Sequence, residues 1–196
     1  MYERKISEQE HRELIERAKE CDSSAFAALY EYYYADIYNF IYHRVGNVQF
    51  AEDLTAEVFL KALESIDSFT FRGIPFPAWL FRLTRNLMID YSRTHPEPLE
   101  MTLPLEEGVL PTAEGRADDV YERKLTRRKM LQALNHLTEE QRDVVVLKFV
   151  EGFSNTDVAQ ILGKSEGAIK SLQHRALDSL SRIWEEVSAE RNQVFD

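Results

Sequence analysis

The sequence has one cysteine, few glycines and no long hydrophobic run. Its 196 residues include one Cys, seven Gly and six Pro. A single cysteine excludes an internal disulfide, so Cys21 is expected to be an ordinary small residue of a helix. The apolar runs are far shorter than the roughly 20 residues that cross a bilayer, and Met1 starts a charged segment without a signal-peptide core. A cytoplasmic protein without direct membrane insertion is therefore expected.

Strand signals are nearly absent, and the pattern predicts an all-α protein with two small helical domains. The β-branched run 144–150 lies inside a longer apolar pattern of period 3.6 (Leu137, Val144, Leu147, Val150), so it is predicted to be helical. Residues 96–122 hold four of the six prolines and eight acidic residues, and they show no periodicity. This segment is predicted to be a flexible acidic linker between domains at 23–95 and 123–184.

Helix patterns fill both predicted domains. The helices expected in the first domain cover 26–45, 51–66 and 78–93, with a loop at 67–77. The apolar stripe expected on the second of these helices consists of Leu54, Val58, Leu63 and Ile66. A short amphipathic helix is predicted within 1–22, and a charged tail within 185–196.

Charge is distributed unevenly along the chain. The formal net charge of −10 argues against a simple nucleic-acid-binding protein, which is usually basic. Residues 71–95, however, include four basic residues and one acidic residue, and 123–184 include eleven basic and seven acidic residues. Two basic islands in an acidic chain indicate two separate contact surfaces rather than a general affinity.

The stretch SNTDVAQILGKSEGAIKSLQHRALDSL, residues 154–180, has the spacing of a helix-turn-helix. Ser154 can cap a first helix, and Asp157 at the third helical position favours the helix dipole. Gly163 suits the left-handed residue that ends this helix, and Ser165 can cap a second helix after a turn of about three residues. Thr138 begins a further capping box, which predicts the start of the preceding helix.

The second helix of this motif has two different faces. Its apolar face consists of Ile169, Leu172, Ala176 and Leu180. The opposite, basic face consists of Gly167, Lys170, Ser171, His174, Arg175 and Arg182. An apolar back and a basic front fit a helix that lies in the major groove of DNA, where such side chains donate to base edges or phosphates. The alternative is a solvated face on an ordinary three-helix core.

The first basic island contains PFPAWLFRLTRNLMIDYSR, residues 75–93. The inner stripe of the helix 78–93 is predicted to be Leu80, Leu83, Leu87 and Tyr91, and the outer side Arg82, Arg85, Asn86, Ile89 and Arg93. Arginines bind phosphates, an asparagine can read a base edge, and the aromatic loop before the helix could receive unstacked bases. Spacing leaves the alternative open that the rings are core residues and the arginines are solvated.

Together, AEDLTAEVFLKAL, FRGIPFPAWLFRLTRNLMIDYSR, the acidic linker and LTEEQRDVVVLKFVEGFSNTDVAQILGKSEGAIKSLQHRAL resemble a bacterial RNA polymerase sigma factor. The resemblance covers about 23–184. It is to the short extracytoplasmic-function (ECF) group of the sigma-70 family, which keeps domains two and four. It implies that 23–95 are domain two, which binds core polymerase and opens the minus-ten element. It also implies that 123–184 are domain four, which reads the minus-thirty-five element.

The resemblance also implies site residues. Single-stranded minus-ten DNA would be contacted by Arg72, Phe76, Arg82, Arg85, Asn86, Ile89 and Arg93, with Trp79 mainly structural. The minus-thirty-five element would be contacted by Lys164, Ser165, Gly167, Lys170, Ser171, His174 and Arg175. The clamp of the largest polymerase subunit would be contacted by Asp53, Leu54, Glu57 and Phe59. Family members often carry basic residues where this chain has Leu172, Leu177 and Asp178, so fewer phosphate contacts are expected.

The implied partners are core polymerase (through its clamp and the flap of its second-largest subunit), promoter DNA and an anti-sigma protein. The implied function is that of an alternative sigma factor, without enzymatic activity, cofactor or metal. A helix-turn-helix regulator that binds duplex DNA without polymerase is the alternative, and it leaves the helix at 78–93 unexplained. An enzyme is disfavoured because the five histidines lack metal-ligand spacing and no Gly-rich phosphate loop is present.

Overall fold

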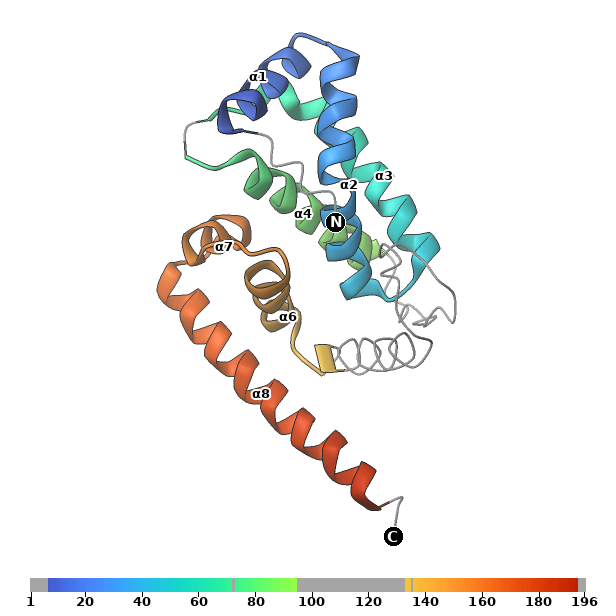
Figure 1. The fold of residues 1–196 in the computed structure, drawn as a ribbon, viewed down its shortest axis with the longest axis vertical. Coiled ribbons are helices and arrows are strands. Elements are labelled where there is room, and N and C mark those ends of the chain that lie inside the picture. Colours follow the sequence, from blue (N-terminus) through green and yellow to red (C-terminus); the bar gives the residue numbers. More distant parts are fainter. Residues whose placement is uncertain (1–6, 72, 95–132, 135, 194–196) are drawn as a thin grey trace. The chain divides into compact units, whose positions relative to one another are not determined.

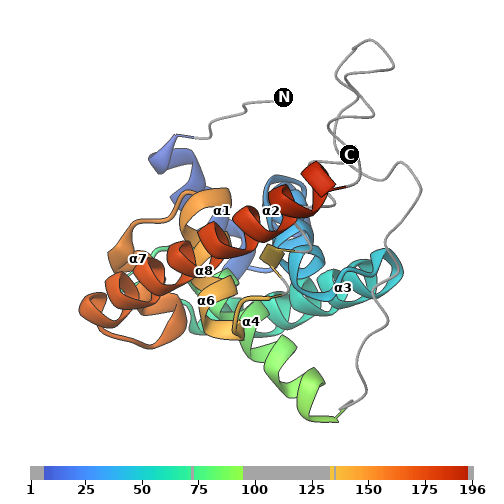
Figure 2. The same cartoon turned by 90° about the horizontal axis from the view of Figure 1, so that it is seen from below.

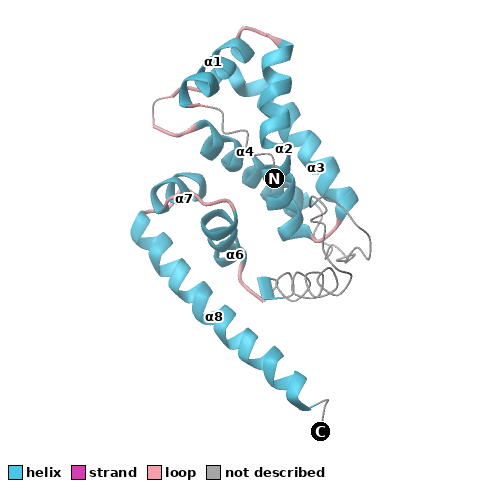
Figure 3. Ribbon diagram, viewed as in Figure 1, coloured by secondary structure: helices cyan, strands magenta, loops and turns pink. Residues whose placement is uncertain are grey.

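The computed structural model describes residues 7–71, 73–94, 133–134 and 136–193, with side chains as far as residue 183. All regular elements in these ranges are helical, as Figure 3 shows. The chain divides into two compact units, Met1–Pro111 and Thr112–Asp196. The division falls within the predicted linker, 96–122, and that segment lies outside the described residues. No helix in the described ranges combines the length and apolar character needed to cross a bilayer.

Within residues 7–71 and 73–94, the first unit has four α-helices and one short turn of 3₁₀-helix. They are α1 (Glu8–Lys19), α2 (Ser23–Val45), α3 (Val48–Ser65), η1 (Ile66–Ser68) and α4 (Phe76–Thr94). α2 packs against α1, α3 and α4 (Figure 1). Its buried side chains include Leu29, Ile37 and Ile41, which are at most 1% exposed. The three helices predicted at 26–45, 51–66 and 78–93 are confirmed. Their starts lie earlier than the sequence suggested, by three residues for α2 and α3 and by two for α4.

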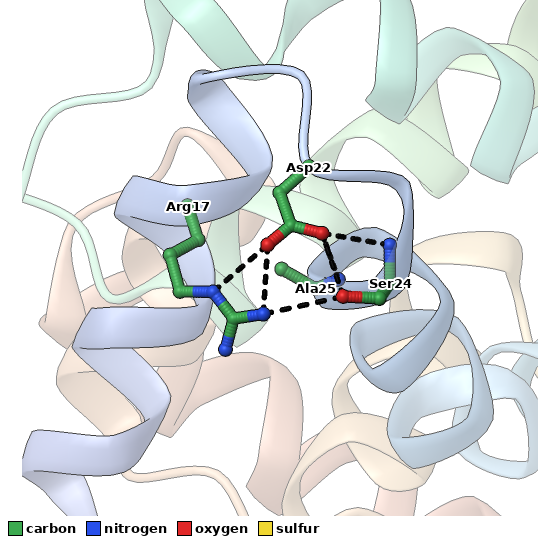
Figure 4. Close-up of polar contacts among 4 residues, drawn as sticks. All are labelled: Arg17, Asp22, Ser24 and Ala25. Atoms are coloured by element: carbon green, nitrogen blue, oxygen red, sulfur yellow. Dashed lines mark hydrogen bonds and ion pairs between the residues drawn. The ribbon is translucent and has the colours of Figure 1, made fainter.

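Side-chain caps fix the junction between α1 and α2. The carboxylate of Asp22 accepts hydrogen bonds from the backbone N–H groups of Ser24 and Ala25, at 2.9 and 3.3 Å. The Arg17 guanidinium donates to the other carboxylate oxygen from Nε at 2.9 Å and Nη2 at 2.7 Å (Figure 4). Donors from Ser24 and Arg17 hold the pKa of Asp22 well below its usual range. Cys21 is not in a helix: it occupies this turn, exposed, with φ of 62°.

The buried hydroxyls of α3 and α4 are satisfied within their own helices. Thr55 donates to the carbonyl of Ala51 at 2.6 Å, and Thr84 donates to that of Leu80 at 2.8 Å. Such local bonds remove the cost of burying a hydroxyl without adding polar contacts between helices. The stripe predicted on α3 is wrong at one position, because Leu63 is 48% exposed.

The described part of the second unit includes α6 (Glu139–Val145), the π-helical turn η2 (Val146–Val150), α7 (Asn155–Leu162) and α8 (Glu166–Gln193). α6 and α7 both pack against α8, the long red helix of Figures 1 and 2. In the π turn, the N–H of Glu151 donates to the carbonyl of Val146 at 3.0 Å. This wider turn rotates the end of the helix, which is why Val150 is 40% exposed although the 3.6-residue pattern predicted it to be apolar core.

The helix-turn-helix has the capping chemistry predicted from the sequence. Ser154 and Asp157 form a capping box at the start of α7, and Gly163 ends it with φ of 63°. The backbone N–H of Ala168 donates to Ser165 Oγ at 3.3 Å, so the first turn of α8 is capped. Three residues separate the end of α7 at Leu162 from the start of α8 at Glu166, as the sequence predicted. The predicted capping box of Thr138 and Gln141 at the start of α6 is also confirmed.

Candidate nucleic-acid interface

A cluster of aromatic rings surrounds the loop that leads into α4. Phe69 is 5.2 Å from both Phe71 and Phe76, measured between ring centroids, and 5.4 Å from Trp79. The ring of Phe76 is also 5.3 Å from that of Trp79. The structure corrects the role expected for Phe76, because its side chain is only 4% exposed. It packs inside this cluster and has no free face for a base, whereas Phe71 and Trp79 are half-buried.

The outward side of α4 carries most of the polar residues predicted to contact single-stranded DNA. Arg82, Asn86 and Arg93 are exposed, and Arg85 and Ile89 are half-buried. The guanidinium of Arg93 is 3.6 Å from the carboxylate of Asp90, one turn earlier, and both are solvated. Such an exposed pair is weak, so Arg93 can exchange this partner for a phosphate. The remaining predicted residue, Arg72, lies outside the described residues.

α8 presents the two faces that its sequence predicts. On the inner side, Ile169 and Ala176 are fully buried and Leu172 is 5% exposed. Lys170, Ser171, His174 and Arg175 are exposed on the outer side. An exposed basic face on a helix whose back is fixed in a core can enter a major groove without disturbing the fold.

The start of α8 adds small and capping residues to this face. Gly167 is exposed, and a Cβ placed there would meet nothing within 4 Å, so another backbone can approach closely. Ser165 is also exposed, whereas Lys164 is half-buried and ion-paired to Glu140 of α6 at 2.7 Å. This ion pair links the turn of the motif to α6. The charge of Lys164 is therefore already partly compensated within the second unit.

α3 offers a third surface, which differs from the one predicted. Asp53 and Glu57 are exposed as expected, but Leu54 is 2% exposed and Phe59 is 5% exposed. These two side chains pack in the core of the first unit and cannot contact a partner directly. The apolar side chains on the outer surface of α3 are instead Leu60 and Leu63, with exposures of 56% and 48%.

The angular positions of residues around α3, which can be calculated from the sequence, identify this outer surface. Leu63 follows Leu54 by nine residues, and at about 100° per residue it lies on the opposite side of the helix. Leu60 likewise points away from the buried side. Sequence reasoning missed both residues because apolar side chains were assigned to the core by type rather than by angle.

Two family models match the two units separately. The model of Sigma-70 region 2 matches residues 29–96, and that of Sigma-70 region 4 matches residues 127–180. The ECF sigma factor SigW of Bacillus subtilis is 32% identical over 181 residues, with 86% of this chain and 93% of the relative covered. The chain belongs to the ECF sigma factors. The matched regions contain the basic faces of α4 and α8, respectively.

Other relatives agree with this family. The ECF sigma factor BldN of Streptomyces coelicolor is 40% identical over 171 residues, which cover 87% of this chain and 64% of BldN. The sigma factor RpoE of Bartonella quintana, solved with the anti-sigma factor NepR, matches with a TM-score of 0.64 and 26% identity, covering 82% of this chain and 96% of RpoE. The fold is also that of CnrH bound to the cytosolic domain of CnrY, with a TM-score of 0.68, 24% identity, and 90% and 97% coverage.

Within the described ranges, His, Cys, Asp and Glu side chains do not gather in a group of three that could hold a metal ion. His11 lies among aromatic rings, and burial lowers its pKa. His174 is exposed on the basic face of α8.

Proposed function

We propose that this ECF sigma factor binds core RNA polymerase and directs it to promoters through two separate DNA contacts. The observation that carries the proposal is the presence of an exposed basic helix face in each unit. One face is on α4, within the region 2 match, and the other is on α8, within the region 4 match. Two separate contacts suit a factor that acts as part of a larger enzyme, because the affinity for the promoter is then shared among several surfaces.

α4 and the preceding aromatic loop would hold the melted minus-ten element. Asn86 is exposed between Arg82 and Arg93, so its amide can pair with a base edge while the arginines neutralise phosphates. The half-buried rings of Phe71 and Trp79 supply faces on which an unpaired base can stack. Phe76 supports these rings from inside and does not contact DNA in this proposal.

α8 would read the minus-thirty-five element as a duplex. Lys170, Ser171, His174 and Arg175 lie on the outer side of its first three turns, which is where a recognition helix meets base edges. The backbone at Gly167 and Ser165 would approach a phosphate at the start of the helix, where the helix dipole favours an anion. The two contacts together would set the position of the polymerase on the promoter.

α3 would dock on core polymerase through a mixed surface. Asp53 and Glu57 supply carboxylates, and the exposed Leu60 takes the place first expected for Leu54 and Phe59. A large apolar side chain surrounded by charges is typical of a protein–protein contact. The clamp of the largest subunit is the proposed partner for α3, and the flap of the second-largest subunit the proposed partner for the second unit.

An anti-sigma protein is the proposed regulator. RpoE, which resembles this chain, was solved in complex with the anti-sigma factor NepR, and CnrH was solved with the cytosolic domain of CnrY. Because the DNA and polymerase contacts lie on helix surfaces that are exposed in the isolated chain, a protein that covers them would block both activities. The sigma factor itself is expected to work in the cytoplasm, where core polymerase is found.

Reconstitution with core polymerase tests the proposal. The holoenzyme should initiate run-off transcripts on a subset of a promoter library, whereas core polymerase or the chain alone should not. Asn86→Ala should slow promoter opening and leave core binding unchanged; loss of core binding would show that α4 has been assigned to the wrong contact. Specific duplex binding by the chain, with no polymerase-dependent transcript, would support the alternative of an independent helix-turn-helix regulator.

A further inference from the structure

α1 lies outside the region 2 match, which begins at residue 29, yet it is packed firmly on the first unit. A capping box of Ser7 and Glu10 begins the helix. Ile15 and Ala18, on its inner side, are 0% and 3% exposed. This amount of specific packing indicates that α1 has a defined position in the first unit, although neither family model assigns it a role.

The same helix contacts the loop between η1 and α4 and the first residue of α4. The guanidinium carbon of Arg12 is 4.7 Å from the ring centroid of Phe71, over its face. The ring of His11 meets that of Phe76 nearly edge-on, with centroids 5.7 Å apart and an interplanar angle of 76°. Two consecutive residues of α1 therefore contact Phe71 in the loop and Phe76, the first residue of α4.

His11 is itself held by α2. Its Nε2 is 2.7 Å from the hydroxyl oxygen of Tyr33, and the two rings are 5.6 Å apart. Tyr33 is only 4% exposed and also contacts the ring of Phe76, at 5.7 Å. The position of α1 over the loop is thus fixed by a hydrogen bond and aromatic contacts that would be lost if the helix moved.

Phe71 depends on these neighbours for its orientation. Phe69 approaches its ring nearly edge-on, at 77°, and Arg12 lies over one face. The following turn contains Gly73 in the left-handed region, with φ of 105°, so the backbone beyond Phe71 bends sharply. The orientation of a half-buried ring at such a bend depends on its neighbours. For Phe71 these include the edge-on ring of Phe69 and the guanidinium of Arg12 over the ring face.

We propose that α1 is a positioning element for minus-ten recognition: Arg12 and His11 hold Phe71 and Phe76 so that the loop can receive an unpaired base. This inference rests on the proposed function of the loop and α4. Arg12 acts through Phe71 and is not itself required to touch DNA. The guanidinium of Arg12 lies against one face of the Phe71 ring. The orientation in which this ring can stack on a base is therefore set before the promoter melts.

A double-mutant cycle of Arg12→Ala and Phe71→Leu in the full chain tests the inference. Opening is followed on reconstituted holoenzyme with a fluorescent base analogue in the minus-ten element. Arg12→Ala should slow opening about two- to fivefold, the ratio expected for an exposed cation–π contact. The double variant should be no slower than Phe71→Leu alone. If the two effects multiply, Arg12 acts independently of the ring, for example on a phosphate, and the inference is wrong.

Control variants separate positioning from simple stability. Arg12→Lys should restore most of the rate because it keeps a cation near the ring, and Glu13→Ala, an exposed change on the same helix, should have no effect. The melting temperature of the full chain and its affinity for core polymerase should be the same for Arg12→Ala and Glu13→Ala. If Arg12→Ala lowers the melting temperature and Arg12→Lys does not restore opening, α1 is a structural support only.

The same assay distinguishes failure of this inference from failure of the proposed function. Asn86→Ala is the reference, because the proposed function requires it to slow opening whatever α1 does. A slow Asn86→Ala variant beside a normal Arg12→Ala variant would overturn the role of α1 alone. Normal opening by both variants would overturn the assignment of the minus-ten contact and, with it, the inference.

Discussion

The imidazole of His174 is ion-paired or hydrogen-bonded to the carboxylate of Asp178, with Nδ1 and Oδ2 2.9 Å apart. The two residues are one turn apart on the outer surface of α8, and both side chains are largely exposed. Because Nδ1 is engaged, Nε2 is the nitrogen that can meet DNA, as an acceptor in the neutral ring or a donor in the charged ring. In the proposed contact of α8 with DNA, Asp178 would also add a negative charge beside the phosphates.

Replacing Asp178 by Asn should therefore increase the affinity of the holoenzyme for any duplex, by roughly two- to fivefold at low salt, because a repulsive charge is removed. The gain should shrink as salt is added. Titration of labelled promoter and non-promoter fragments over a salt series measures both effects. Asp67→Asn, the same charge change in η1, is the control, and equal gains from the two variants would place Asp178 away from the DNA.

Lys170 and Arg175 provide a test of direct readout. Alanine at either position should cost about 1–3 kcal/mol of promoter binding if the side chain contacts a base, and specificity should relax at one position of the minus-thirty-five element. Binding of the holoenzyme to a set of single-base promoter variants measures this. A uniform loss over all sequences would identify the residue as a phosphate contact. Lys19→Ala, a loss of one cation from α1, should leave binding unchanged.

Leu54 and Leu60 should respond in opposite ways. Leu54→Ala removes a buried side chain and should lower the free energy of unfolding by about 2–5 kcal/mol, as measured by urea denaturation. Leu60→Ser changes an exposed side chain and should alter the free energy of unfolding by less than about 0.5 kcal/mol. It should nevertheless weaken the binding of core polymerase in a direct titration. Unchanged core binding by Leu60→Ser would remove the outer surface of α3 from the proposed interface.

His11 should make the first unit sensitive to mild acid. Burial lowers the pKa of His11 from its usual 6.5, so the folded state favours the neutral ring. Its contribution to stability is fully present above pH 6.5 and is lost as the pH falls below that value, because the unfolded state takes up the proton more readily. Urea denaturation between about pH 7.5 and 5.5 should show this decline in the wild type. His11→Gln should show a smaller decline; an equal decline would trace the effect to other groups.

The features that were predicted correctly from the sequence depend on local chemistry. The capping boxes at Thr138 and Ser154 and the left-handed Gly163 each involve residues within one turn of each other, so their side chains alone specify the geometry. The inward and outward faces of α8 follow from helical period in the same way. The helical class and the two-part organisation could therefore be derived before any coordinates were available.

The burial of Phe76 and Phe59, which the sequence did not indicate, depends on packing between distant segments. Phe76 is covered by His11 and Tyr33, which precede it by more than forty residues, and nothing in the local sequence indicates this. Phe59 likewise packs on Tyr30 of α2, with ring centroids 4.6 Å apart. Residue type suggested an aromatic or apolar contact in each case, but only the tertiary structure shows whether that contact is internal or available to a partner.

The π-helical turn at Val146–Val150 contains one residue more than an α-helical turn of the same path would need. Its backbone bonds span five residues rather than four, as the bond from Glu151 to Val146 shows, so the chain there is longer than the helix strictly needs. A deletion in most helices shifts every later side chain by about 100°. A deletion within this turn could instead be absorbed by tightening it to ordinary α pitch. A deletion of one residue from this turn is consequently expected to leave the spacing of the helix-turn-helix unchanged.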